Sequence, residues 1–360
     1  MIDFINTAKS NEGIIDTLLS GIREVIESGQ YVLGDKLRVF EKKIAEYCGT
    51  KYAVGVNSGT DALSLCLRSL RKNKGEVITV GFTFPATVMS ILSVGFTPIF
   101  VDVDETGTMD PSDLELKLTD NTVAIVPVHF MGHVCNMNKI MSIANRNGVP
   151  VIEDACQALG GTYMGKSAGS FGLAGCFSFF PTKNLSCIGD GGAITTNNEN
   201  LYGSLILLRN FGRTDRESFD SFGLNTRLDE IQAFVLTEKL KYLDSITEQR
   251  RGIALRYTEA LSDAFTIVHP PLGGCSSYHL YVIRVENNEK VVKELAKKKI
   301  DCRIHYSKPC HKQPFIKSSA VLPYTDRLSK EVMSLPIGEY LEYRHQKEII
   351  NGLLEIKHAS

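Results

Sequence analysis

Short apolar runs rich in β-branched residues alternate with amphipathic segments through the first two thirds of the chain. Five such runs, bounded by Gly, Asn or Asp, have the length of buried strands: Tyr52–Val56, Val77–Val80, Thr97–Val101, Val123–Val128 and Pro150–Ile152. Between them the apolar residues follow helical spacing, as in residues 62–70. Because crossover helices connect parallel strands, this order predicts an α/β fold with a mostly parallel sheet covered by helices on both faces.

The last third of the chain has a different pattern. A long helical pattern extends from about Arg227 to Leu261, and it is followed by a predicted strand and two predicted helices: His279–Val285, Val291–Lys298 and Tyr343–Ile356. A chain of 360 residues exceeds the usual size of one domain. We therefore expect a large α/β domain over residues 1–240 and a smaller C-terminal α+β domain over residues 241–360.

Composition excludes several classes of partner. Lys and Arg total 40 against 41 acidic residues and are interleaved with them, which argues against a nucleic-acid partner. No apolar stretch approaches the roughly 20 residues of a membrane span, and the first residues do not resemble a secretory signal. The nine cysteines form no CxxC pair. Reduced thiols in a cytoplasmic protein are therefore expected rather than a disulfide framework, with no metal site and no membrane partner.

Lys183 is the first candidate for chemistry. It lies in the segment Ser178–Leu185, where two phenylalanines and a proline precede it, and the glycine-rich segment Gly189–Ala193 follows. A lysine framed by apolar residues loses water around its ammonium, which lowers its pKa and provides a neutral amine that can attack a carbonyl carbon. Most lysines are solvated surface charges, so this interpretation depends on its neighbours in the fold.

Asp154 ends an apolar run, Val151–Asp154, that is predicted to be a strand. Ligands of open parallel sheets bind beyond the carboxyl ends of the strands. A carboxylate at that place can pair with a pyridinium nitrogen and keep it protonated. The alternative is an acid that caps a following helix.

A third pattern, Val56–Leu63, has a strand leading through small residues into a helix. Backbone amides and the dipole at the start of a helix favour an anion such as a phosphate. Gly59 would allow close approach and Thr60 would add a hydroxyl. The alternative is an ordinary capped strand-to-helix turn.

With these three patterns in this order, the chain resembles the DegT/DnrJ/EryC1/StrS family of sugar aminotransferases. The resemblance extends from Tyr31-Val32-Leu33-Gly34 to Ser334-Leu335-Pro336-Ile337. It implies the aspartate-aminotransferase-like fold type I, with a mostly parallel seven-stranded sheet between helices and a smaller C-terminal α+β domain. It also implies pyridoxal 5'-phosphate (PLP) as the cofactor.

The resemblance assigns roles to positions of this sequence. Lys183 would hold the cofactor, Asp154 would pair with its pyridine nitrogen, and Gln157 would lie beside its phenolic oxygen. Phe84 matches the aromatic residue that stacks on the ring, with core packing as its alternative. The remaining matched positions bind the phosphate: Ser58, Gly59, Thr60 and Ser178.

Further assignments concern the substrate and a second subunit. Asn225 would reach the neighbouring subunit's site and complete its phosphate cup, which implies a homodimer with shared active sites. Arg227 would meet acidic groups of the substrate, or would pair with a neighbouring acid on a helix face. His305 and Tyr306 would contact the substrate, although a lone His or Tyr is more often structural.

The implied function is transfer of an amino group from L-glutamate to a nucleotide-linked keto-deoxy sugar in amino-sugar biosynthesis, for a surface polysaccharide or a secondary metabolite. The segment from Asn225 to Glu230 is most similar to members that act on 3-keto nucleotide sugars. A 4-keto sugar or a cyclitol remains open as the acceptor. Two other interpretations are a PLP-dependent sugar dehydratase, in which a His replaces the lysine, and a PLP-binding regulator without turnover.

Overall fold

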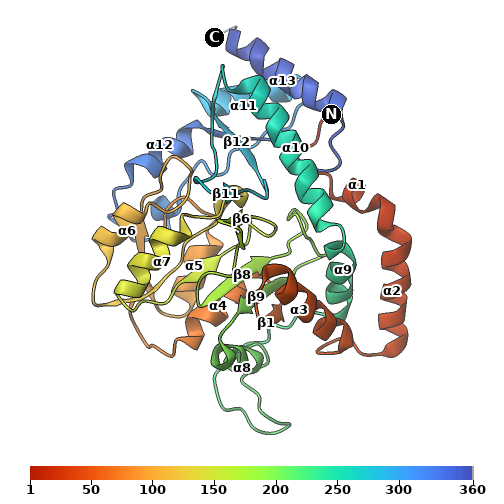
Figure 1. Cartoon of the computed structure of the whole chain (residues 1–360), viewed down its shortest axis with the longest axis vertical. Coiled ribbons are helices and arrows are strands. Elements are labelled where there is room, and N and C mark those ends of the chain that lie inside the picture. Colours follow the sequence, from red (N-terminus) through yellow and green to blue (C-terminus); the bar gives the residue numbers. More distant parts are fainter. Residues whose placement is uncertain (359–360) are drawn as a thin grey trace.

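The computed structural model describes residues 1–358 and shows a twisted sheet between two layers of helices (Figure 1). The sheet consists of two hydrogen-bonded groups of strands, in the orders β1-β9-β8-β5 and β3-β2-β4. Parallel bridges between Ile125 and Val151 and between Val128 and Asp154 join the groups. Seven strands of the described residues therefore form one layer: β1 (Tyr52–Val56), β9 (Gly192–Thr196), β8 (Ala174–Ser178), β5 (Ile152–Asp154), β4 (Thr122–Ile125), β2 (Glu76–Val80) and β3 (Thr97–Val101).

Within this layer β9 pairs antiparallel with both of its neighbours, and the other pairings are parallel. The expectation of a mostly parallel seven-stranded sheet is confirmed. Three strands of this layer differ in their bounds from the sequence prediction, and β2 differs only in beginning one residue earlier, at Glu76. β4 ends at Ile125 and β5 begins at Ile152. Pro127 and Pro150 lie near these ends, and a proline has no N–H to donate to a ladder.

Neighbouring residues of a strand point to opposite faces of the sheet, so each strand contributes to two cores. Ala53 and Ile78 belong to one core, and the adjacent Val54 and Val77 belong to the other. The first core is covered by α3 (Asp35–Cys48), α6 (Pro111–Lys117), α7 (Met137–Arg146) and α9 (Glu230–Leu240). The second is covered by α4 (Gly59–Ser69), α5 (Ala86–Ser93) and α8 (Glu199–Leu208).

The C-terminal part of the chain forms a separate antiparallel sheet, in the order β10-β12-β13. Its strands are β10 (Thr266–Ile267), β12 (Tyr281–Arg284) and β13 (Val332–Leu335), and its helices are α10 (Leu243–Leu261), α11 (Asn288–Lys297), α12 (Pro323–Glu331) and α13 (Tyr343–His358). A core of its own includes Tyr257, Ile283 and Leu353. It also includes Ile2, which bridges to Ile300, so the N-terminus packs with the C-terminal part. The domain division at residue 240 stays a prediction.

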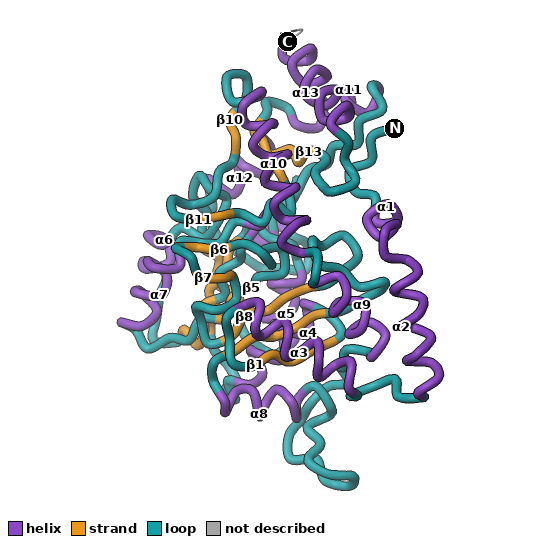
Figure 2. Tube along the Cα trace, turned by 45° about the vertical axis from the view of Figure 1, so that its right-hand side comes forward, coloured by secondary structure: helices purple, strands orange, loops and turns teal. Residues whose placement is uncertain are grey.

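The remaining elements connect these layers. The helices α1 (Thr7–Asn11) and α2 (Ile15–Ser28) form a column beside α9 (Figure 2). A small antiparallel sheet contains β6 (Thr162–Tyr163), β7 (Lys166–Ser167) and β11 (Gly274–Cys275), and short 3-10 helices cover Glu12–Ile14, Phe130–Gly132 and Cys310–Lys312. No helix within residues 1–358 is long and apolar enough to cross a membrane.

The helical pattern predicted from about Arg227 to Leu261 does not form one continuous helix. It is two helices, α9 and α10, which are separated at Lys241 and Tyr242. The break lets α9 pack against α2 and α3 of the large sheet, while α10 turns away to pack against α13 (Figure 1). Tertiary packing thus divides a segment whose local pattern is continuous.

Candidate active site

A cavity of about 350 Å³ opens at the carboxyl ends of the parallel strands β2, β4, β5 and β8. Its lining includes every predicted site residue except Asn225 and Arg227. These lining residues are Ser58, Gly59, Thr60, Phe84, Asp154, Gln157, Ser178, Lys183, His305 and Tyr306. Residues far apart in the sequence therefore meet in one place, as the topology of an open parallel sheet requires.

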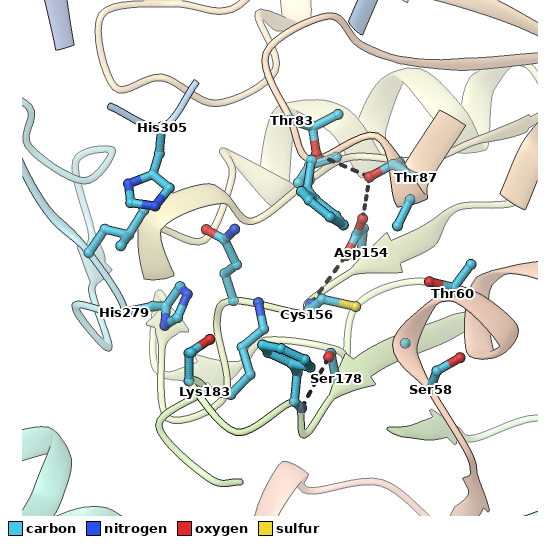
Figure 3. Close-up of a pocket in the computed structure, with 18 of the residues that line it drawn as sticks. Ser58, Thr60, Thr83, Thr87, Asp154, Cys156, Ser178, Lys183, His279 and His305 are labelled. Atoms are coloured by element: carbon cyan, nitrogen blue, oxygen red, sulfur yellow. Dashed lines mark hydrogen bonds between the residues drawn. The ribbon is translucent and has the colours of Figure 1, made fainter. Parts of the chain in front are cut away.

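Asp154 is the last residue of β5, and its side chain is almost entirely buried. Thr87, in the first turn of α5, donates a hydrogen bond to its Oδ2 at 2.7 Å, and the backbone N–H of Cys156 donates to its Oδ1 at 3.2 Å. Thr83 lies behind Thr87, with the two hydroxyl oxygens 3.0 Å apart (Figure 3). No helix follows Asp154 directly, so the helix-capping alternative is wrong. The carboxylate is fixed in one orientation at the cavity wall.

Lys183 lies in the turn after β8, where its backbone N–H donates to the carbonyl oxygen of Phe180 at 2.8 Å. Burial lowers the pKa of Lys183, while Cys156 and Asp154 oppose this shift. Within residues 1–358 its Nζ has no hydrogen bond or ion pair. Figure 3 shows the side chain extending into the cavity, toward the side on which Asp154 and Cys156 lie. The amine is thus freer than a surface lysine to lose its proton.

The turn from β1 to α4 presents the start of a helix to the cavity. Ser58 is the N-cap, and its Oγ accepts a hydrogen bond from the N–H of Asp61 at 3.1 Å. A Cβ at Gly59 would lie 2.6 Å from the Sγ of Cys156 and 2.8 Å from the Cβ of Ser178, so only glycine fits there. The N–H groups of Gly59 and Thr60 have no partner within the helix. The turn is therefore both a capped helix start and a place for an anion.

The chemical groups that line the cavity match those of PLP. The start of α4 and the hydroxyl of Ser178 suit a phosphate, the carboxylate of Asp154 suits a protonated ring nitrogen, and Lys183 provides an amine between them. Phe84, which is 54% exposed, offers an aromatic face at the cavity instead of packing in the core. No group of His, Cys, Asp and Glu side chains in the described part of the chain has the arrangement of a metal site.

The side chains opposite the sheet come from the C-terminal part. They meet Gln157, which lies in the turn after β5 and also lines the cavity. Its Oε1 accepts a hydrogen bond from the N–H of Met131 at 2.9 Å, and its side chain bonds to the hydroxyl of Tyr306. Burial raises the pKa of Tyr306 to about 12, against the effect of that bond. Burial, together with Arg303 and Lys183, lowers the pKa of His305 to about 4. At neutral pH both side chains are uncharged groups that can form hydrogen bonds.

Asn225 and Arg227 lie outside the cavity of their own chain. Between them the hydroxyl of Thr226 is buried, 2.6 Å from Oδ1 of Asn57 and 2.9 Å from Oδ2 of Asp61. This contact ties the segment to the start of α4 and leaves Asn225 exposed. Arg227 lies in the segment before α9 and donates to Oδ1 of Asn210 at 3.0 Å. Among the described residues it forms no ion pair with Asp229 or Glu230, so the alternative of a pair on a helix face is wrong.

Several lining residues were not found by sequence reasoning. Thr87 belongs to the segment 83–87, in which only Phe84 was assigned a role, although a Thr at the start of a helix after Pro85 was a visible signal. Arg303 and His279 also line the cavity. His279 is 9% exposed, its Nδ1 has no hydrogen-bond partner in the described residues, and burial lowers its pKa well below the usual value. Its place beside Lys183 follows only from the fold (Figure 3).

Comparison with known proteins agrees with this geometry. The sequence model of the DegT/DnrJ/EryC1/StrS aminotransferase family matches residues 14–354. The chain belongs to this family. It is a PLP-dependent aminotransferase with the fold type I architecture.

Members of the DegT/DnrJ/EryC1/StrS family resemble the chain over nearly its whole length. It is 36% identical over 362 residues to a dTDP-3-amino-3,4,6-trideoxy-alpha-D-glucose transaminase of Streptomyces venezuelae, covering 98% of this chain and 96% of the relative. It is 37% identical over 358 residues to a UDP-2-acetamido-2-deoxy-3-oxo-D-glucuronate aminotransferase of Pseudomonas aeruginosa, covering 98% and 99%. The solved structure of NtdA from Bacillus subtilis with bound cofactor PMP has a TM-score of 0.93 at 29% identity, over 99% of this chain and 85% of that one.

Proposed function

We propose that this chain transfers an amino group from L-glutamate to a nucleotide-linked keto-deoxy sugar, at a ketone on carbon 3, in amino-sugar biosynthesis in the cytoplasm. The observation that carries the proposal is the amine of Lys183, which has a lowered pKa and lies in one cavity with Asp154 and the start of α4. The relatives named above support the acceptor, because their names specify 3-amino or 3-oxo nucleotide sugars. A lysine at position 183 favours amino transfer over the dehydration performed by members with a histidine there.

Each residue of the cavity has a task toward the cofactor in this proposal. The N–H groups of Gly59 and Thr60 and the hydroxyl of Ser178 would hold its phosphate. Asp154 would keep a proton on its ring nitrogen, and the hydrogen bond from Thr87 keeps that carboxylate in place. When bound, PLP supplies an electron sink for the negative charge that develops at the substrate carbon.

Lys183 would move the proton in both halves of the reaction. Its Nζ would take the proton from the α-carbon of glutamate, and would later return a proton to the sugar carbon that receives the amine. The lowered pKa suits this task, because a neutral amine is a base and a protonated one is not. The enclosed side chain reaches the cavity without an ion pair that would have to be broken first.

The substrate would lie between the sheet and the C-terminal part. Tyr306 and His305 are uncharged at neutral pH, so they can form hydrogen bonds with the hydroxyl groups of a sugar without attracting counterions. Asn225 and Arg227 do not line the cavity of their own chain. We therefore propose a homodimer in which each Asn225 completes the phosphate site of the other subunit, with Arg227 beside the acidic groups of its substrate.

The test uses the variants Lys183→Ala and Lys183→Arg, with Lys166→Ala at an exposed site as the control. The wild type and the control should change the visible absorption of the bound cofactor when L-glutamate is added, and should then aminate one member of a panel of UDP- and dTDP-linked 3-keto and 4-keto sugars. Both Lys183 variants should lose amination. Full activity in Lys183→Ala would refute the role of this lysine, and turnover of 4-keto sugars alone would refute the assigned ketone position.

A further inference from the structure

Both substrates of the proposed reaction are anions, and the cavity provides few cations to bind them. Among the lining residues of the described chain, the side chains with a permanent or potential positive charge are Lys183, Arg303, His279 and His305. The two histidines are neutral at physiological pH, because burial lowers their pKa. Lys183 is engaged in the chemistry. Arg303 is thus the one remaining lining residue within residues 1–358 that can offer a positive charge to an anionic substrate.

The backbone of Arg303 is held at the side of the cavity by hydrogen bonds to β13. Its backbone N–H donates to the carbonyl oxygen of Ser334 at 3.1 Å, and the N–H of Ser334 donates back at 2.7 Å. Ser334 is a fully buried residue of β13 that also holds His305, with 2.9 Å between its Oγ and the Nδ1 of the imidazole. The same strand therefore positions both Arg303 and His305 at the cavity.

The guanidinium lies close to the cavity wall formed by the N-terminal segment. Its central carbon is 5.0 Å from the centre of the ring of Phe4, which is buried and lines the cavity. The ring of Phe4 in turn lies 5.4 Å from the ring of His305. Stacking on an aromatic face restricts a guanidinium while leaving its N–H groups free to bind an oxyanion in pairs.

Asp301 is the competing partner of this guanidinium. Its Oδ2 lies 2.9 Å from Nη2 of Arg303, and the side chains of Arg303 and Asp301 are 53% and 36% exposed. An exposed ion pair of this kind contributes little and exchanges readily. The guanidinium has five N–H donors, so it can bind a second oxyanion while it keeps or gives up Asp301.

We propose that Arg303 is a substrate-binding residue that recognises an oxyanion of the amino donor or of the sugar nucleotide at the mouth of the cavity. This inference rests on the proposed function, because it takes its two ligands from that reaction. The carboxylates of glutamate and the diphosphate of a nucleotide sugar offer the same chemistry, namely paired oxygens with negative charge. The two sources are separated by the choice of probe.

The experiment measures binding to the holoenzyme by calorimetry with two unreactive classes of probe. Glutarate represents the donor, and UDP and dTDP represent the nucleotide of the acceptor. Arg303→Gln should weaken the binding of one probe class, or of both, by about ten- to hundred-fold, as expected for loss of a charge-assisted hydrogen bond. Arg303→Lys keeps the charge without the paired donors and should lie between the wild type and Arg303→Gln.

Two further variants serve as controls. Asp301→Asn frees the guanidinium and should leave binding unchanged or make it tighter. Arg38→Gln removes an arginine of another exposed ion pair, with Asp35, that does not line the cavity, and should have no effect on either probe. If Arg303→Gln binds both probe classes as tightly as the wild type does, the inference is wrong.

Failure of the inference can be told apart from failure of the proposed function. A wild-type enzyme that binds glutarate through Arg303 but transfers no amino group from glutamate would contradict the proposed donor and leave the anion site standing. An enzyme that aminates a 3-keto sugar equally well with and without the Arg303 side chain would support the proposed function and contradict the role of Arg303. A loss confined to UDP and dTDP would assign Arg303 to the acceptor, and a loss confined to glutarate would assign it to the donor.

Discussion

The hydroxyl of Thr87 donates a hydrogen bond to Oδ2 of Asp154 at 2.7 Å. Because Asp154 is buried, loss of this bond would leave one carboxylate oxygen without a partner, and the carboxylate could turn away from the ring nitrogen. Thr87 does not need to touch the reacting atoms. It acts through Asp154 and is a positioning residue.

Replacing Thr87 with Val tests this role, since Val has nearly the same shape and no hydroxyl. A hydrogen bond to a charged group contributes about 1.5–3 kcal/mol, so amino transfer should slow by roughly ten- to hundred-fold. Thr87→Ser restores the donor and should restore most of the rate. The measurement is kcat for each half of the reaction, with the absorption spectrum of the bound cofactor as a second readout. Equal rates for the Val and Ser variants would contradict the role.

Single residues were predictable from the sequence where a local motif surrounds them, and not otherwise. Asp154 and the turn at Ser58–Thr60 end or follow a predicted strand, and Lys183 lies in a segment framed by apolar residues. The structure brings them to one cavity. His279 has no such motif, and in the segment that begins at Arg303 only His305 and Tyr306 were assigned a role. His279 and Arg303 reach the cavity because the C-terminal part of the chain packs at the carboxyl ends of the large sheet, and no local pattern predicts a contact between such distant segments.

At the scale of elements, the start of α3 is capped by a residue distant in sequence. Its N-cap, Gly34, has no side chain to accept a hydrogen bond. The carboxylate of Glu230, in the first turn of α9, accepts instead from the N–H groups of Gly34 at 2.7 Å, Lys36 at 2.8 Å and Leu37 at 3.2 Å. Glu230 is 2% exposed. This carboxylate holds α3 and α9 together on one face of the sheet.

Replacing Glu230 with Ala should lower the free energy of unfolding by about 2–4 kcal/mol, because three N–H groups at the start of α3 lose their acceptor. Glu230→Gln keeps one acceptor oxygen and should lose less. Unfolding by urea, followed by far-ultraviolet circular dichroism, measures the effect. The control is Glu24→Gln, at an exposed carboxylate 2.9 Å from Lys36, which should cost less than about 1 kcal/mol. A loss in Glu230→Ala as small as that of the control would refute the cap.

Elements were largely predictable where their own residues determine them. β1 and β3 have the predicted bounds, and α13 begins at the predicted Tyr343. The strands β8 and β9 were not predicted. The antiparallel direction of β9 was also hidden, because strand direction depends on connections and not on the alternation of residues. The cap by Glu230 was equally hidden, although a glycine at the start of a helix signals that an acceptor must come from elsewhere.

The whole molecule carries imidazoles that are buried in the neutral form. Burial lowers the pKa of His133 to about 4 and that of His279 well below its usual value. The unfolded chain binds protons at these residues near pH 6.5, and the folded chain does not. Below about pH 6.5 the unfolded state therefore holds more protons at His133 and His279 than the folded state does, so the stability that these two neutral imidazoles provide is lost as the pH falls.

Unfolding at about pH 7 and about pH 5 tests this dependence, and each fully buried imidazole can account for at most about 2 kcal/mol of the loss. His133→Gln should reduce the difference between the free energies of unfolding at the two pH values, even if the variant is less stable than the wild type at both. His358→Gln, at an exposed site, should leave the difference as in the wild type. The prediction fails if both variants show the wild-type difference.

The proposed dimer makes the active site a property of two chains, and mixing inactive variants tests this directly. Asn225 is exposed next to Thr226, which is anchored at the start of α4, and it does not line the cavity of its own chain. Lys183→Ala and Asn225→Ala should each lose activity as homodimers. In a mixed dimer, the site with an intact lysine would receive its asparagine from the Lys183→Ala partner, while the other site would lack both.

Random mixing of the two variants, by refolding them together, makes half of the dimers mixed, and each of these has one complete site. The mixture should therefore regain up to about a quarter of the wild-type activity. If Asn225 acted within its own chain, neither site of a mixed dimer would be complete, and no activity would return. Refolded wild-type protein alone and each refolded variant alone set the upper and lower limits of the assay. Recovery of activity to that level would show that Asn225 acts in the partner's cavity. If the mixture stays inactive while the refolded wild type is active, the shared site is refuted.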